Sequence, residues 1–224
     1  MMGDVFLSAK VRECEVRGSC VRVAPWLPLG EVLSGSVVLE SVGEEMRAGF
    51  VAALTDVWLG GQQRLGALTY HGRRDGMTAT AFHGCCDGKG PTLTLIRSEN
   101  GCVFGGYVSS SWEAPQRGIQ YVACDEAFLF SVVGPFGSVT QFPLRAGRRG
   151  EAMSCSSDRG PSFGDYMGFN DLEVRSAGGA RDLFDGNSYC YLGSAFVDTL
   201  GKGGKTFTGT LFFFPTDIEV YAVL

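Results

Sequence analysis

The segment from Arg73 to Trp112 contains most of the side chains of this chain that could perform chemistry. His83 is followed by Cys85, Cys86 and Asp87. A histidine beside a cysteine can activate the thiol as a nucleophile or a redox sensor, and the same donor types bind metal ions. These residues therefore raise three possibilities, which are a thiol enzyme, a redox sensor and a metal site.

The spacing of these residues does not favour a metal site. On a helix, His83 and Asp87 share a face, whereas the adjacent Cys85 and Cys86 diverge by about 100°. Zinc sites usually combine two Cys or His pairs separated by a loop, and the remaining cysteines supply no second pair. We predict no metal, no cofactor and no catalytic residue. A redox-active thiol at Cys85, Cys86 or Cys102, close to His83, stays open as the alternative.

The loop from Asp87 to Pro91 is the segment that we expect to contact a partner. Asp87 can accept backbone N–H groups, Gly88 and Gly90 can adopt positive φ, and Pro91 fixes the entry into the next strand. A turn does not require an exposed ammonium group. Lys89 is therefore the first candidate for partner binding, with Asp87 beside it.

Aromatic residues after this loop are further candidates for packing and binding. Trp112 follows three serines at the end of a predicted hairpin, where it could anchor an interface. The hydroxyl group of Tyr107 could also meet a partner. Phe104, Gly105 and Gly106 have the pattern of a strand that another backbone or ring approaches closely, so we assign them to packing.

Arg74, Asp75 and Gly76 are predicted to have a structural role. Arg74 and Asp75 either pair with each other, or Asp75 caps the following helix while Arg74 holds a carboxylate such as Glu219. A short helix is expected after Asp75, with Phe82 on its apolar stripe.

A second helix and a series of strands are expected around these residues. The helix begins at a Ser41–Glu44 capping box and carries apolar residues from Val42 to Val57 on one face. Asn100-Gly101 predicts a hairpin turn. The predicted strands are Thr92–Arg97, Cys102–Tyr107, Ala127–Val133, Gly137–Leu144, Asp171–Arg175, Ser188–Leu192, Phe207–Phe214 and Ile218–Val223.

Apolar residues on both faces of the strands at 127–133 and 207–214 predict strands that are covered on each side. The fold class is therefore mostly β (α+β), an antiparallel two-sheet β-sandwich flanked by short helices. The Gly-rich segment 146–164 is expected to be an exposed loop. Residues 1–33 are expected to form an arm with β-like runs at Val5–Val16 and Cys20–Ala24, and residues 34–224 the main domain.

Composition limits the classes of partner. The 224 residues have a net charge of −5, which argues against nucleic acid, since such binding needs clustered Lys and Arg. No apolar run is long enough to span a membrane, and the N-terminus lacks the pattern of a signal peptide. We expect a cytoplasmic protein whose eight cysteines are mostly reduced.

From about Ser34 to its end, the chain resembles the TLDc domain, the module of oxidation-resistance proteins. The motifs that carry the resemblance are Arg74-Asp75-Gly76, Ala81-Phe82-His83, Cys86 to Leu93, Phe104-Gly105-Gly106-Tyr107, Trp112, Ala127 to Ser131, Phe163-Gly164, Asp171-Leu172 and Ile218 to Tyr221. The resemblance implies an antiparallel β-sandwich without a cofactor. It also implies a non-catalytic, protein-binding role in protection against oxidative stress, with vacuolar-type proton-pumping ATPase subunits as partners. Met77 and the loop 136–161 depart from the pattern of many relatives.

Overall fold

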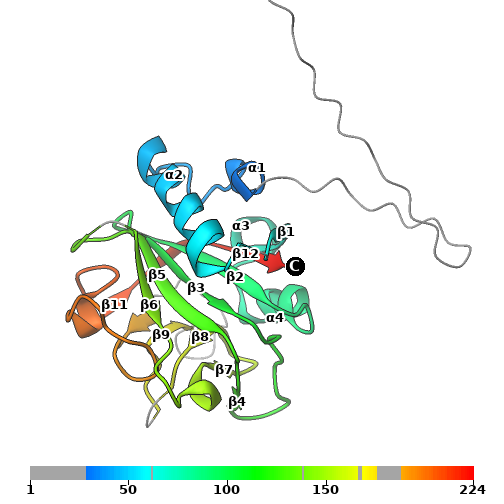
Figure 1. Ribbon diagram of the computed structural model, residues 1–224. Coiled ribbons are helices and arrows are strands. Elements are labelled where there is room, and N and C mark those ends of the chain that lie inside the picture. Colours follow the sequence, from blue (N-terminus) through cyan, green and yellow to red (C-terminus); the bar gives the residue numbers. More distant parts are fainter. Residues whose placement is uncertain (1–28, 62, 138, 166–167, 176–187) are drawn as a thin grey trace, which may run out of the picture.

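Two antiparallel sheets of six strands face each other in the computed structural model (Figure 1). The structure describes residues 29–61, 63–137, 139–165, 168–175 and 188–224. The first sheet has the order β1 (Leu65–His71), β12 (Pro215–Val223), β2 (Thr92–Ser98), β3 (Val103–Val108), β5 (Ala127–Val133) and β6 (Thr140–Pro143). The second has the order β11 (Phe212–Phe213), β10 (Ser188–Cys190), β9 (Leu172–Arg175), β8 (Arg159–Phe163), β7 (Met153–Cys155) and β4 (Gln120–Val122). The predicted two-sheet architecture is confirmed.

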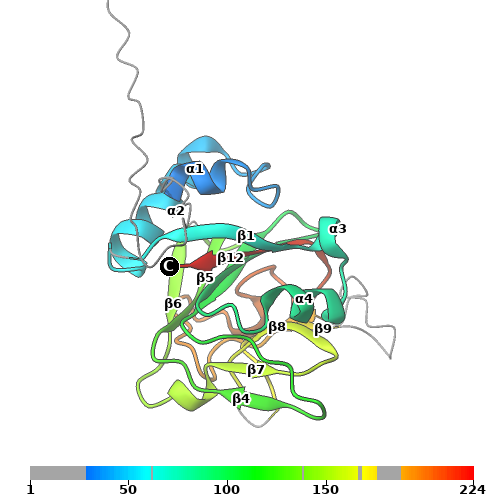
Figure 2. The ribbon, with the colours of Figure 1, turned by 90° about the vertical axis from the view of Figure 1, so that its right-hand side faces the viewer.

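Helical segments cover the outer face of the first sheet, opposite the second sheet (Figure 2). They are α1 (Leu29–Ser34), α2 (Glu44–Ala52) and the π-helical η1 (Ala53–Trp58). The rings of Phe50 and Phe130 lie 5.2 Å apart across this contact. The remaining helical elements are α3 (Gly72–Asp75), α4 (Ala79–Cys86), η2 (Arg149–Glu151) and η3 (Gly203–Lys205). Within the described ranges, no helix is long and apolar enough to cross a membrane.

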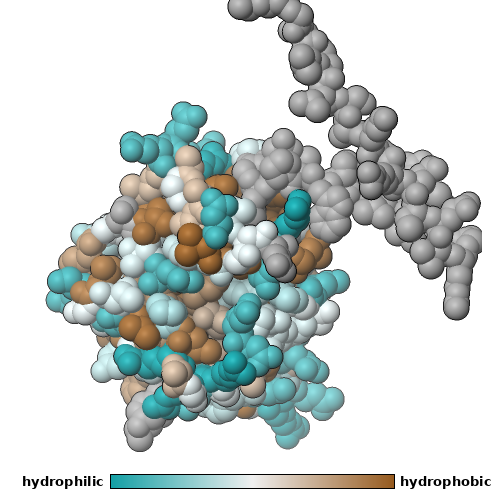
Figure 3. All heavy atoms as spheres, in the orientation of Figure 1, coloured by the Kyte–Doolittle hydropathy of each residue, from teal (hydrophilic) through white to brown (hydrophobic). Residues whose placement is uncertain are grey.

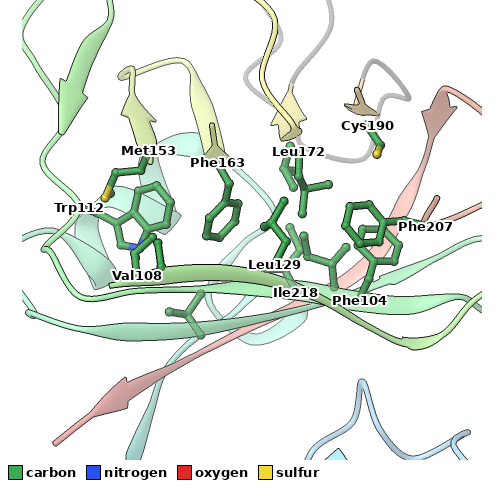
Figure 4. Close-up of a cluster of buried hydrophobic side chains, with 14 of the residues drawn as sticks. Phe104, Val108, Trp112, Leu129, Met153, Phe163, Leu172, Cys190, Phe207 and Ile218 are labelled. Carbon is green, nitrogen blue, oxygen red and sulfur yellow. The ribbon is translucent and has the colours of Figure 1, made fainter. Parts of the chain in front are cut away.

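Two hydrophobic clusters explain why the central strands are apolar on both faces. In β5, Ala127 and Leu129 belong to the cluster between the sheets, whereas Phe128 and Phe130 belong to the cluster under the helices. Side chains of successive strand residues point to opposite faces, so each face of β5 packs against a different layer. Figure 4 shows the cluster between the sheets, to which strands of both sheets contribute side chains.

Both predicted helices have N-caps that differ from the predicted ones. Helix α2 begins after Gly43, which makes no side-chain cap, so Ser41 is not its N-cap. Helix α4 is capped by Thr78, whose Oγ1 accepts the Ala81 N–H at 3.1 Å. Asp75 lies instead in the separate turn α3, because the positive φ of Gly76, 105°, interrupts the helix there.

Two other expectations about the elements differ from the structure. The segment 146–164 is not an exposed loop, since β7 and most of β8 are buried within it. The predicted strand 207–214 is reduced to the two residues of β11, preceded by turns. Strands β1 and β4 were not predicted. The predicted runs Val5–Val16 and Cys20–Ala24 lie outside the described residues, and the division at residue 34 stays a prediction.

Candidate functional site

The loop from Asp87 to Gly90 is fixed at both ends by hydrogen bonds to the segment 111–114. One carboxylate oxygen of Asp87 lies 2.8 Å from Nδ1 of His83, and the other accepts the Ala114 N–H at 2.9 Å. Gly88 donates its N–H to the Trp112 carbonyl at 3.0 Å, and Gly90 donates to Ser111 Oγ at 2.8 Å. Both glycines have positive φ, as expected. The loop is therefore a preformed structure.

Lys89 stands at the exposed tip of this loop, between the two glycines. Within the described ranges, no carboxylate lies within ion-pair distance of its ammonium group. A charge that is held on a preformed loop and is not neutralised locally is available to an external acidic group.

His83 is a buried structural link between α4 and the second sheet. Its Nε2 lies 2.9 Å from the Ser156 carbonyl oxygen and 3.1 Å from that of Arg159. Carbonyl oxygens only accept hydrogen bonds, so Nε2 carries the proton and donates it. Nδ1 meets Asp87. Because both ring nitrogens are engaged, His83 is not placed to deprotonate a thiol.

Cys86 and Cys102, two of the three thiols considered with His83, do not have the environment of a reactive cysteine. Burial raises the pKa of Cys86 and of Cys102 above the ordinary thiol value, which keeps both thiols protonated. Cys85 is partly buried. All six cysteines of the described residues are free, and no cluster of metal-binding side chains occurs in the same ranges.

Trp112 is not an exposed interface anchor, which corrects the prediction. Its side chain is fully buried, and its Nε1 donates to Thr92 Oγ1 at 3.0 Å. The ring makes edge-to-face contacts with Phe82 and Phe163, with ring centres 5.4 Å apart in each case. Figure 4 shows Trp112 and Phe163 in the cluster between the sheets. Trp112 therefore joins α4 to the second sheet within the core.

Tyr107 is likewise buried, on the opposite face of the first sheet. Its hydroxyl group donates to Gln63 Oε1 at 2.9 Å, and its ring stacks against Phe128 at 5.1 Å. Neither aromatic residue of the predicted binding set is therefore on the surface.

The remaining motif residues serve the fold. Arg74 donates to the Asp75 carboxylate at 2.7 and 2.8 Å, so the local pair forms rather than a contact with Glu219. This hydrogen bond lowers the pKa of Asp75. Pro91 precedes β2 and accepts the Val223 N–H at 2.9 Å. Phe104 stacks on Phe207 at 4.9 Å.

Glu219 instead holds the segment between α1 and α2 on the first sheet. This fully buried carboxylate accepts the Ser36 hydroxyl at 2.5 Å, the Val37 N–H at 2.8 Å and the Tyr221 hydroxyl at 3.1 Å. Arg97 adds a hydrogen bond to the Val37 carbonyl at 3.1 Å. A glutamate among the apolar residues Ile218, Val220 and Ala222, on the same strand face as Tyr221, was the signal for this role.

Asp217 also lies on this face of β12, and the sequence reasoning missed it. Its buried carboxylate is 3.2 Å from His71 Nε2 and 3.4 Å from Arg73 Nε. The contact between His71 and Asp217 fixes the end of β1, because His71 is the last residue of that strand.

Asp171 is another buried carboxylate, and it organises the loop after β10. Its oxygens accept the N–H groups of Gly193, Ser194 and Ala195 at 2.6, 2.8 and 2.7 Å. Burial nevertheless raises the pKa of Asp171 from its ordinary 3.8 to about 6, since desolvation outweighs these hydrogen bonds.

We expect the stability contributed by Asp171 to fall as the pH rises. A carboxyl group whose pKa is higher in the folded state binds its proton more tightly there, so the folded state is favoured at low pH and loses this advantage between about pH 4 and 6. The loss should approach about 3 kcal/mol. In urea unfolding between pH 4 and 7, the free energy of unfolding should decline more steeply with rising pH for the wild-type chain than for Asp171→Asn. Parallel pH profiles would contradict the prediction.

Comparison with known proteins agrees with the motifs described above. The model of the TLDc domain family matches residues 61–223, which contain every strand of both sheets. A segment of 65 residues is 34% identical to the MTOR-associated protein MEAK7 of Danio rerio. That alignment covers 29% of this chain and 14% of the relative, so the chain spans a small part of that protein's length. Because the family match includes most of the sequence and the complete sandwich, the chain belongs to the TLDc domain family.

Proposed function

We propose that this chain is a non-catalytic protein-interaction domain that binds subunits of the vacuolar-type proton-pumping ATPase in the cytoplasm. Through that binding it contributes to protection against oxidative stress. Membership of the TLDc family supports the proposal, and the name of the relative MEAK7 describes an association with another protein.

The observation that carries the proposal is the contrast between Lys89 and the potentially reactive residues around it. His83, Cys86 and Cys102 are buried in the fold, and both His83 nitrogens are engaged. Lys89 is exposed on a loop that is fixed at both ends. A preformed loop loses little conformational entropy on binding, which favours recognition of an acidic surface.

Lys89→Glu is expected to reduce recovery of proton-pump subunits about tenfold, because the substitution places like charges in contact with an acidic partner surface. The tagged full chain would be isolated from lysate of its own cell type under reducing conditions, and the subunits quantified by mass spectrometry. Arg117→Glu makes the same change of charge at another exposed residue and should leave recovery unchanged.

Three results would contradict parts of this proposal. Equal recovery with Lys89→Glu would show that Lys89 is not in the interface. Absence of pump subunits with the wild-type chain would exclude the ATPase as its partner under these conditions. Fast alkylation of Cys85, Cys86 or Cys102 near neutral pH would instead favour a thiol sensor.

A further inference from the structure

His83 lies between hydrogen-bond acceptors on both sides of its ring. Nε2 is 2.9 Å from the Ser156 carbonyl oxygen and 3.1 Å from that of Arg159, and Nδ1 is 2.8 Å from a carboxylate oxygen of Asp87. A rotation of the ring by half a turn would put carbon atoms in place of both nitrogens and lose all three contacts. A neutral imidazole carries a proton on one nitrogen only, whereas the imidazolium cation carries one on each. The contacts therefore need a proton on each nitrogen, unless Asp87 supplies one of them.

Asp87 has the surroundings of an ionised carboxylate. Its second oxygen accepts the Ala114 N–H at 2.9 Å, and 31% of its side chain is exposed to solvent. Both features favour the charged form of a carboxyl group, since the hydrogen bond stabilises it and water solvates it. The proton between Asp87 and His83 therefore belongs to Nδ1. This makes His83 a cation in the observed arrangement, and its contact with Asp87 a charge-assisted hydrogen bond.

The loop that presents Lys89 depends on the position of the Asp87 carboxylate. Asp87 follows α4 directly, and its side chain reaches across to Ala114 on the neighbouring segment. Without the Nδ1 proton, a lone pair of His83 would face an acceptor oxygen at 2.8 Å, and the two groups would repel each other. Two carbonyl groups hold Nε2, so the partly exposed Asp87 side chain is the partner that can move. Its departure leaves the Ala114 N–H without this acceptor and loosens the loop.

Among the described residues around this pair, the other ionisable groups keep their charge between about pH 5.5 and 8, the range in which histidine titrates. Thiols, Cys85 included, are mainly protonated there. Burial raises the pKa of Cys86 in α4 and of Cys155 in β7 further. The remaining groups are carboxylates, guanidinium groups and one ammonium group, which do not titrate in this range: Arg74, Asp75, Lys89, Glu113, Asp158 and Arg159. His71 in β1 is also a histidine, but its ring contacts Asp217.

The surface around the loop is polar. Figure 3 shows mainly hydrophilic and intermediate residues on the side of the molecule where Figure 1 places α4. Recognition at such a surface depends on charge and hydrogen bonds, and therefore on the position in which the loop holds the Lys89 ammonium group.

We propose that the His83–Asp87 pair is a pH-sensitive switch for the loop that presents Lys89. The protonated pair holds the loop in its preformed position, and loss of the Nδ1 proton releases the loop. Because the contact needs this proton, the ordered loop is favoured at low pH and loses its support as the pH rises through the range in which histidine titrates. The inference rests on the proposed function, since it concerns regulation of the same loop.

NMR spectroscopy of the ¹⁵N-labelled full chain tests the switch without any partner. At pH 5.5, both ring nitrogens of His83 should have the chemical shifts of protonated nitrogens, and the Ala114 amide should be protected from exchange with water. At pH 8, Nδ1 should have lost its proton. The protection factor of Ala114, which is corrected for the intrinsic pH dependence of exchange, should then be about tenfold lower, as expected for the loss of a hydrogen bond to a charged group.

Asp87→Asn separates the charge of this site from its shape. The asparagine oxygen can accept the Ala114 N–H, and its amide group can donate to Nδ1 of a neutral His83. This variant should therefore keep Ala114 protected at both pH values. His71→Gln is the matched control, because it removes the other histidine of the chain, which contacts Asp217. It should show the pH response of the wild type.

Two results overturn the proposal. Equal protection of Ala114 at pH 5.5 and pH 8 in the wild-type chain would show that the loop does not respond to this proton. A pH response that persists in Asp87→Asn would assign it to another group. The sample contains no ATPase, so neither result decides whether the loop binds the proton pump, which Lys89→Glu tests separately.

Discussion

Gly105→Ala is expected to lower the free energy of unfolding by about 3 kcal/mol, the upper part of the range for overpacking a core. Gly105 lies in β3, between Leu95 of β2 and Phe130 of β5. A Cβ atom at this position would overlap the Thr94 carbonyl oxygen, and it would lie 2.9 Å from the Thr94 carbonyl carbon. The obstacle is backbone of a central strand, which cannot move aside as a flexible side chain can. Urea unfolding monitored by circular dichroism would measure the loss.

Gly49→Ala provides the control for this prediction. Gly49 lies exposed in α2, and a Cβ there would meet no atom within 4 Å. Alanine favours helix more than glycine does, so this variant should gain about 0.5 to 1 kcal/mol. If Gly105→Ala unfolds at the same urea concentration as the wild type, the close strand packing that we describe at Gly105 is wrong.

Glu219→Ala is expected to destabilise the chain by about 3 kcal/mol, since it leaves buried polar groups without partners. The Ser36 hydroxyl, the Val37 N–H and the Tyr221 hydroxyl all donate to this carboxylate. Their loss should release the segment between α1 and α2 from the first sheet. Hydrogen exchange should therefore accelerate at Val37 and Leu39, and urea unfolding should shift to lower concentration.

Glu40→Ala is the matched control, because Glu40 is exposed in the same segment. Its removal should change the stability by no more than about 0.5 kcal/mol. Unchanged exchange at Val37 in Glu219→Ala would show that Glu219 does not hold this segment. A destabilised chain with unchanged local exchange would place the effect elsewhere in the sheet.

Local patterns predicted the central hairpin and several core strands. Asn100-Gly101 marks the turn between β2 and β3, and Gly101 has the positive φ of 79° that such a turn favours. Apolar residues on both faces of Ala127–Val133 indicated a strand between two layers, as observed. These predictions depend on neighbouring residues only, which is why the sequence was sufficient for them.

Local sequence patterns could not predict which residues are buried by parts of the chain that are distant in the sequence. The segment 146–164 is rich in glycine and arginine, yet β7 and β8 within it are buried. Trp112 was expected on the surface because it follows three serines, but Phe82 and Phe163 enclose it. Only the packing of α4 against the second sheet decides that this indole faces inward.

The sequence by itself determined the mostly-β class, the alternation of the core strands and the preformed turn around Lys89. Each of these follows from side-chain periodicity, or from the backbone freedom of glycine, over a few residues. The tertiary structure decided which polar groups are buried and what they hold. Glu219 meets Ser36, and Asp171 meets the loop after β10, because β-sheet pairing brings together residues far apart in the chain.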